Sequence, residues 1–248
     1  MSDKNNALVT GANKGIGLAI ARQLGERGFA VWLGCRDADR GEKAAAGLRA
    51  GGVDARSITL DVADGSSVMA AVARLEEEAR VLDVLVNNAG ISVGSPPPKV
   101  IEEPIDDVRA MFEVNTLGPL RVTQALLPLL RKSAAPRIVM MSSGLGSISD
   151  TADMTSLIWN VGAAGYSASK AALNMLTVKL AKALLADGIK VNAADPGYTA
   201  TDLNGHTGTR TVEEAAAIAV ELATLDPLGP TGGFFNDGYA DKMGRYRW

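Results

Sequence analysis

Short runs of apolar residues alternate along the chain with longer segments in which apolar residues recur at helical spacing. The apolar runs are rich in β-branched residues, which favour strands, and the longer segments have the period of amphipathic helices. The predicted strands are Asn6–Val9, Ala30–Gly34, Ala55–Leu60, Val84–Asn87, Arg137–Met141, Lys190–Ala194 and Gly233–Asn236. The predicted helices are Ile16–Arg27, Asp39–Ala50, Ser66–Glu78, Ile105–Leu130, Ala163–Ala186 and Thr211–Leu225.

Continuous apolar strands that alternate with helices are typical of a parallel sheet covered on both faces. The pattern therefore predicts an α/β fold: a single doubly wound (Rossmann) domain whose seven-stranded parallel sheet carries helices on both faces. No repeat, low-complexity tract or linker divides residues 1–248. The proline-rich stretch SPPPKVIEEP, residues 95–104, is interpreted as a surface loop within that domain.

Two predicted helices carry further local signals. Asn115 lies in the middle of the helix predicted over 105–130, shortly before Gly118 and Pro119, which predicts a kink with freed backbone groups. A buried Asn bonded to its neighbours is the alternative. The last helix opens with Thr211 and has Glu214 three residues on, the pattern of a capping box.

Composition narrows the function classes. The net charge of −3 gives no basic footprint for nucleic acid or an anionic membrane, and no apolar run is long enough for a membrane span. The N-terminus lacks a signal-peptide pattern, and the single Cys35 excludes an internal disulfide, so a cytoplasmic location is expected. With one Cys and one His, no metal site is expected. A Ser-His-Asp hydrolase would need His206, which lies in a predicted loop.

A glycine-rich loop, TGANKGIG, follows the first predicted strand and opens the first helix. Gly11, Gly15 and Gly17 permit a tight turn, and the helix N-terminus beginning near Ile16 favours an anion such as a pyrophosphate. Chance could produce the glycine spacing alone, but its place after the first strand predicts a dinucleotide site.

The end of the second strand bears on which dinucleotide binds. An acid there favours NAD, whereas a cation can accept the 2′-phosphate of NADP. The stretch offers both, since Arg36 and Asp37 are adjacent, but the position just past the strand is Cys35. Lys14 in the glycine loop adds a second cation. Although both cations could be merely solvated, the pattern favours NADP(H).

Three more motifs follow strands or open a helix: NNAG at 87–90, MMSSG at 140–144 and YSASK at 166–170. Each is weak by itself, and NNAG on its own is more typical of an ordinary turn. Tyr166 and Lys170, four residues apart, would share one face of a helix.

Taken in order, these motifs resemble the short-chain dehydrogenase/reductase family over essentially the whole chain, and most closely its NADPH-dependent carbonyl reductase branch. Further matches are the Asn of EVNTLG and the PG pair at 196–197. The resemblance implies a catalytic tetrad of Asn115, Ser143, Tyr166 and Lys170. It implies a cofactor-binding set of Gly11, Asn13, Lys14, Gly15, Ile16, Arg36, Asp61, Val62, Asn88, Ala89, Gly90, Tyr166, Lys170, Pro196, Gly197, Thr199 and Thr201, with Ile91 close by.

The resemblance also implies roles and a reaction. Residues 1–140 would form the cofactor half and 141–248 the catalytic and substrate half. Tyr166 would be the general acid that protonates a ketone or aldehyde as NADPH gives hydride, and Lys170 would lower the pKa of its phenol. Ser143 would donate to the carbonyl oxygen, and Asn115 would hold a water beside Lys170. The alternatives are an alcohol or steroid dehydrogenase working in oxidation, and a non-catalytic NADP(H)-sensing protein on the same fold.

The chain departs from the family pattern between Ser143 and Tyr166, which are unusually far apart. The extra segment contains Leu157, Ile158 and Trp159, and we expect it to border an apolar substrate pocket; the alternative is that Trp159 packs into the core. A small-molecule carbonyl or alcohol is the expected partner. A homo-oligomer is compatible with the two long helices, and the C-terminal YADKMGRYRW fits either a surface tail or a subunit contact.

Overall fold

A computed structural model of the chain describes residues 4–94, 98–236, 244–245 and 248. Its centre is one sheet with the strand order β3-β2-β1-β4-β5-β6-β7-β8. The seven strands β1 to β7 are parallel, as predicted, and β8 pairs with β7 in the antiparallel direction. Their bounds are β1 Asn6–Thr10, β2 Ala30–Cys35, β3 Ala55–Thr59, β4 Val84–Asn87, β5 Arg137–Met141, β6 Lys190–Ala194, β7 Phe234–Asn236 and β8 Gly244–Arg245.

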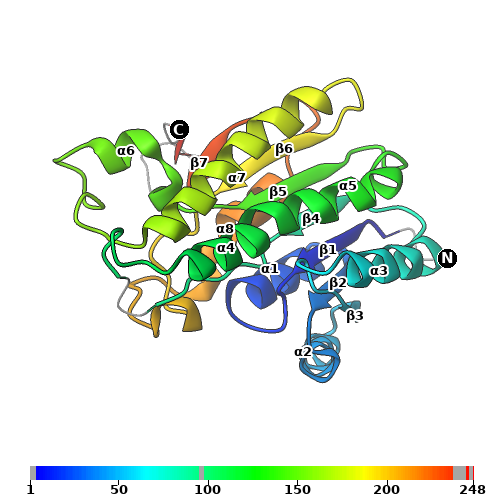
Figure 1. The fold of residues 1–248 in the computed structure, drawn as a ribbon. Coiled ribbons are helices and arrows are strands. Elements are labelled where there is room, and N and C mark those ends of the chain that lie inside the picture. The colour runs from blue at the N-terminus through cyan, green and yellow to red at the C-terminus, as the bar shows by residue number, and fades with distance from the viewer. Residues whose placement is uncertain (1–3, 95–97, 237–243, 246–247) are drawn as a thin grey trace.

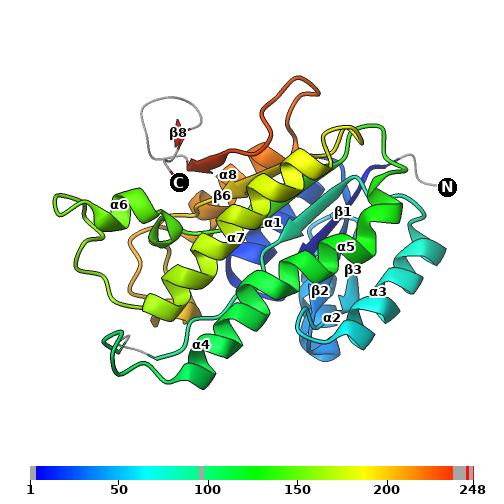
Figure 2. The ribbon, with the colours of Figure 1, turned by 45° about the horizontal axis from the view of Figure 1, so that its top comes forward.

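Helices cover both faces of this sheet (Figures 1 and 2). One face packs against α1 (Gly15–Glu26), α2 (Ala38–Ala50) and α8 (Val212–Ala223). The other packs against α3 (Gly65–Glu78), α5 (Gly118–Leu130) and α7 (Ala164–Ala183). Neighbouring residues of β1 divide between the two cores, Ala7 and Val9 on one side and Leu8 on the other, so the apolar run is buried on both faces.

The helix predicted over 105–130 is interrupted as its polar centre suggested. An α-helix, α4 (Ile105–Phe112), leads into a π-helical turn, η1 (Glu113–Leu117), and α5 follows. Pro119 lies in the first turn of α5, where a missing N–H costs little. Asn115 is fully buried in the π-helical turn. The predicted capping box at the start of α8 is also present, since Thr211 and Glu214 bond each other reciprocally.

The described part of the C-terminal stretch returns to the sheet of its own chain. Gly244 and Arg245 form β8, and the Trp248 ring stacks on Phe234 with the ring centroids 5.6 Å apart. The backbone of Ser149 donates to the Trp248 carbonyl, and its hydroxyl does so at 2.8 Å. A free surface tail is therefore wrong for these residues; the remainder of YADKMGRYRW, like residues 95–97 of the proline-rich stretch, lies outside the described residues.

Short elements complete the chain after β5 and β6. They are the 3₁₀ turns η2 (Gly144–Gly146) and η3 (Asp202–Asn204) and the helix α6 (Ile148–Ala152). In the part of the chain that the structure describes, no helix has the length and apolar character needed to cross a membrane.

Candidate active site

The site lies at the carboxyl ends of β1, β4, β5 and β6, where strand order changes direction between β1 and β4. In doubly wound sheets this switch point is where ligands bind. The glycine loop turns there: Gly11 and Gly15 have φ of 66° and 58°, values that L side chains rarely adopt. A Cβ at Gly17 would approach the Gly11 carbonyl oxygen to 2.6 Å, so the loop and α1 can pack this closely only with glycine.

The glycine loop has the properties of an anion cradle. The N-cap of α1 is Lys14, whose ammonium has no acceptor, so no side-chain cap occupies the first amides of the helix. A Cβ at Gly15 would meet only the Thr201 methyl, 4.0 Å away, which leaves space between the loop and the segment after β6. The residues present therefore fit a phosphate group at the N-terminus of α1.

The predicted cofactor residues after β3 and β4 make local bonds that shape this region. The Asn88 amide donates to the Thr10 carbonyl at 2.8 Å and so braces the glycine loop from the next strand. Asp61 accepts from the Ala63 N–H at 2.9 Å, and the Val62 carbonyl accepts from Arg121. Ala89 accompanies Asn88 in this bracing, because both backbone N–H groups donate to the Thr10 hydroxyl.

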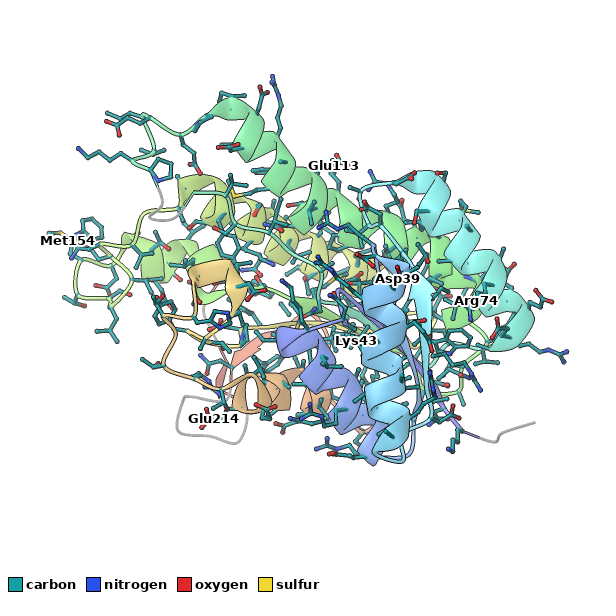
Figure 3. All side chains as sticks on the ribbon, turned by 90° about the horizontal axis from the view of Figure 1, so that it is seen from below. Asp39, Lys43, Arg74, Glu113, Met154 and Glu214 are labelled. Atoms are coloured by element: carbon teal, nitrogen blue, oxygen red, sulfur yellow. The ribbon has the colours of Figure 1, made fainter. Side chains whose placement is uncertain are left out.

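A cleft of about 560 Å³ separates the start of α1 from α2. Besides Lys14 and Asn13, Arg40 and Lys43 of α2 line it, and both are exposed; Figure 3 shows Lys43 on α2, which lies beside α1. Asp37, the acid that could have favoured NAD, instead caps α2 by accepting from the Arg40 N–H at 3.0 Å. The sequence motifs did not identify Arg40 and Lys43 as cofactor-binding candidates. Their spacing of three residues nevertheless puts both on one face of the helix that follows Arg36.

The four tetrad candidates come from three parts of the chain: α7, the turn after β5 and the π-helical turn η1. Tyr166 and Lys170 lie in the first two turns of α7, and the Lys170 Nζ is 5.6 Å from the centroid of the Tyr166 ring. The ammonium donates to the Met141 carbonyl at the end of β5, at 2.7 Å. Ser143 follows β5 and hydrogen-bonds to Tyr166 through its side chain. A phenol, a hydroxyl and an ammonium thus meet at the carboxyl end of β5.

Asn115 joins the π-helical turn to two neighbours of this cluster. Its Oδ1 accepts from the Ile91 N–H and its Nδ2 donates to the Ile91 carbonyl, both at 2.8 Å. The same Nδ2 lies 3.0 Å from the Ser169 hydroxyl. A Cβ at Gly90 would lie 3.3 Å from Asn115 Oδ1 and 3.6 Å from Lys170 Nζ, so only a small residue leaves these two side chains adjacent.

The protonation of the pair differs from the expectation that Lys170 lowers the pKa of Tyr166. Burial raises the pKa of Tyr166 to about 12. The hydrogen bond from Ser143 lowers this pKa, and the negative charge of Asp195 raises it further. Burial also lowers the pKa of Lys170 to about 8, with Asp195 acting in the opposite direction. Lys170 is 4% exposed, whereas Tyr166 is half-buried, so loss of hydration acts most fully on the ammonium.

The segment after β6 packs against the glycine loop. Gly197 has a φ of 70°, and its N–H donates to the Asp195 carboxylate at 3.0 Å. The buried Thr199 donates to the Pro196 carbonyl at 3.1 Å. Lys14 forms an ion pair with Asp202, so it is engaged here rather than merely solvated.

The segment between Ser143 and α7 leaves its apolar side chains exposed. Leu157 is 99% exposed and Trp159 is 42% exposed, so the alternative that Trp159 packs into the core is wrong. Figures 1 and 2 show this segment, which includes α6, extending from the same edge of the molecule as the loop after β6, and Figure 3 places Met154 at its outer end. Whether it borders a substrate pocket stays a prediction.

One contact at the start of α7 was not anticipated. The N-cap residue, Ala163, has a left-handed backbone (φ 64°) and no side-chain cap. The Glu103 carboxylate, from the loop before α4, accepts from the Gly165 N–H at 2.8 Å in its place. Its other oxygen is buried, with no hydrogen-bond partner among the described residues. The partners are 62 positions apart, so no local pattern could have indicated the pair.

Comparisons with known proteins agree with this geometry. The family model for the short chain dehydrogenase matches residues 5–211. The chain is 36% identical to the short-chain dehydrogenase anuI of Penicillium roqueforti, with 88% of this chain and 87% of that protein covered. It is 34% identical to the (-)-isopiperitenone reductase of Mentha piperita, with 92% and 95% covered. The structure superposes on an NADPH-bound carbonyl reductase from chicken fatty liver with a TM-score of 0.86 and 31% identity, covering 99% of each chain.

Proposed function

The chain belongs to the short-chain dehydrogenase family, and we propose that it is an NADPH-dependent reductase that converts a ketone or aldehyde to an alcohol. The observation that carries this proposal is the cluster of Ser143, Tyr166 and Lys170 beside the glycine loop. These groups supply a proton donor, a second hydrogen-bond donor and a cation, which together could protonate one carbonyl oxygen and stabilise its negative charge.

The choice of NADPH is supported by charge. Four cations lie around the end of β2 and the adjoining cleft: Lys14, Arg36, Arg40 and Lys43. The nearby acid, Asp37, accepts a hydrogen bond at the N-cap of α2 instead. These cations would hold the 2′-phosphate, and the N-terminus of α1 would hold the pyrophosphate. The similar carbonyl reductase from chicken fatty liver is an NADPH-bound protein.

When bound, the nicotinamide supplies the hydride. Tyr166 gives its phenolic proton to the carbonyl oxygen, and Ser143 donates a hydrogen bond to the same oxygen as negative charge develops there. Hydrogen bonds of this kind generally contribute about 3 kcal/mol to transition-state stability. Lys170 places a positive charge behind the phenol and stabilises the phenolate that the proton transfer leaves.

The raised pKa of Tyr166 supports reduction over oxidation. With a pKa of about 12 the phenol is protonated at neutral pH, which is the form that a carbonyl reduction consumes. Oxidation of an alcohol would begin from the phenolate form instead. The substrate class that this reaction implies is a small carbonyl compound.

A spectrophotometric screen tests the proposal. NADPH loss is followed with a panel of ketones and aldehydes, with NADH in parallel and with the matching alcohols plus NADP⁺ in the reverse direction. We expect turnover with several carbonyls, a preference for NADPH, and faster reduction than oxidation at neutral pH. Faster oxidation at that pH would favour the alcohol dehydrogenase alternative, and tight NADPH binding without turnover would favour the sensing protein.

A further inference from the structure

Asn174 is a buried polar residue of α7 that neither the tetrad nor the cofactor-binding set includes. It lies one helical turn after Lys170 and about two turns after Tyr166, so its side chain is on the same side of the helix as theirs. It is only 3% exposed. Because a buried amide is costly unless its polar atoms are hydrogen-bonded, the partners of Asn174 indicate what it does there.

Both polar atoms of the Asn174 amide bind the turn that carries Ser143. Its Oδ1 accepts from the Ser142 hydroxyl at 2.6 Å, and its Nδ2 donates to the Gly146 carbonyl at 3.1 Å. A backbone carbonyl can only accept, so the amide nitrogen has to face Gly146 and the amide oxygen has to face Ser142. One side chain of α7 therefore holds the residue before Ser143 and the last residue of the 3₁₀ turn η2 that follows it.

The turn η2 also packs directly on the backbone of α7. A Cβ at Gly146 would lie 2.9 Å from the Lys170 carbonyl carbon and 3.0 Å from the Ala171 nitrogen, so this approach requires glycine. Within the turn, the Gly146 N–H donates to the Ser143 carbonyl at 2.8 Å, and the Leu145 N–H donates to the Ser143 hydroxyl at 3.3 Å. The position of Ser143 relative to α7 thus depends on how the two ends of this turn are anchored.

Two other anchors lie close to the turn, and both act at its beginning. The Ser142 N–H donates to the Ala194 carbonyl at 2.7 Å, which ties the turn to β6. The Lys170 ammonium donates to the carbonyl of Met141, the residue before Ser142. Neither bond involves Gly146, the end of the turn that Asn174 binds.

We propose that Asn174 is a positioning residue for the reaction: by tying both ends of the Ser143 turn to α7, it holds the Ser143 hydroxyl at the Tyr166 phenol. This inference rests on the proposed function, because it assigns a role within the same site. In that reaction Ser143 and Tyr166 must face one carbonyl oxygen, and a misplaced donor stabilises the developing charge poorly. Without Asn174, the turn would keep its bond to β6 and lose this link to the helix that bears Tyr166.

A double-mutant cycle tests the role, with Asn174→Ala introduced into the wild type and into the Ser143→Ala variant. If Asn174 acts through Ser143, the change should lower kcat about tenfold in the wild type, with little change in the KM for NADPH. It should have almost no effect on kcat where the Ser143 hydroxyl is already absent. A merely structural role would lower kcat to a similar extent in both backgrounds, because it would act on Tyr166 and Lys170 as well.

Thr177→Val is the matched control. Thr177 is also fully buried on α7, but its hydroxyl donates to the Leu173 carbonyl of the same helix at 2.9 Å. Ser142→Ala breaks the link to Asn174 from the other side and serves should Asn174→Ala fail to fold. The second readout is amide hydrogen exchange over residues 142–147 in cofactor-free protein, measured by mass spectrometry.

We expect Asn174→Ala, and to a smaller degree Ser142→Ala, to speed exchange over residues 142–147 and to leave the glycine loop unchanged, while Thr177→Val alters neither exchange nor kcat. Equal kcat losses in the two backgrounds, or unchanged exchange over 142–147, would overturn the proposal. Because exchange needs no turnover, faster exchange confined to 142–147 in a protein that reduces no carbonyl would contradict the proposed function and leave the anchoring of the turn by Asn174 intact.

Discussion

Two groups of charged residues share the same edge of the sheet and differ in their exposure to water. The buried centre comprises Lys170 and Asp195 together with the half-buried Tyr166, and the basic rim comprises Lys14, Arg36, Arg40 and Lys43. In the buried centre, desolvation shifts the pKa of both Tyr166 and Lys170 away from their usual values. All four residues of the basic rim are exposed.

The difference separates the tasks that each group can perform. Exposed charges interact through a field screened by salt, which suits the recognition of a phosphate and makes its binding sensitive to ionic strength. Buried groups can be held in an unusual protonation state, which suits proton transfer. Substitutions in the buried centre should therefore change turnover and its pH dependence, and substitutions in the basic rim should change cofactor affinity.

The largest effect is expected for Tyr166→Phe. The change removes the phenolic proton while the ring remains, so turnover should fall about a thousandfold, within the range usual for a general acid, and NADPH affinity should hardly change. Steady-state kinetics and NADPH fluorescence titration measure the two quantities. Near-normal turnover in this variant would remove Tyr166 from its proposed role.

The basic rim is tested by Arg36→Ala and by Arg40→Ala. Losing one charged contact to the 2′-phosphate should raise the KM for NADPH about tenfold, leave the KM for NADH nearly unchanged and weaken the salt dependence of NADPH binding. Lys182→Ala, which removes an exposed charge from the last turn of α7, is the control. Equal changes for NADPH and NADH would mean that neither arginine reads the phosphate.

A smaller effect is expected for Glu103→Ala, which removes the cap from the first turn of the helix that bears both Tyr166 and Lys170. Loss of a helix cap typically costs about 1 kcal/mol, so the variant should melt a few degrees lower. Its kcat should fall several-fold with little change in the KM for NADPH. Glu103→Gln retains an acceptor oxygen and should recover most of both losses; equal losses in the two variants would contradict a capping role.

The smallest effect is expected for the ion pair between Lys14 and Asp202, because both side chains are exposed. Asp202→Asn should leave the denaturation midpoint unchanged within error, since exposed pairs contribute little to stability. A clear destabilisation that disappears at high salt would show that this pair fastens the segment after β6 to the glycine loop more strongly than its exposure suggests.

Sequence reasoning recovered the fold because each strand is a local apolar run. The strands Val84–Asn87, Arg137–Met141 and Lys190–Ala194 have the predicted bounds, and the bounds of β2 and β3 differ by one residue at one end. The interruption around Asn115 was predicted from a polar residue within an apolar helix, although its form, a π-helical turn, was not. The strand β8 was missed because its two residues gain their conformation only by pairing with β7.

The site was less accessible to sequence reasoning wherever it depends on contacts between distant segments. Glu103 accepts from the Gly165 N–H across 62 positions of the sequence, so this contact leaves no periodic trace. The direction of the Tyr166 pKa was mistaken for the same reason. Spacing on a helix reveals the neighbouring charge but not the burial, which depends on β6, η2, α4 and η1 packing around α7.

The most direct test of the account is the transfer of deuterium from NADPH labelled at the reactive carbon of the nicotinamide. With a carbonyl identified in the screen, the wild-type protein should yield an alcohol that carries the deuterium on its carbinol carbon, as measured by mass spectrometry. The Tyr166→Phe variant should bind the labelled cofactor and form almost none of that product. Unlabelled alcohol from the wild type, or equal labelling by both proteins, would contradict hydride transfer with Tyr166 as the acid.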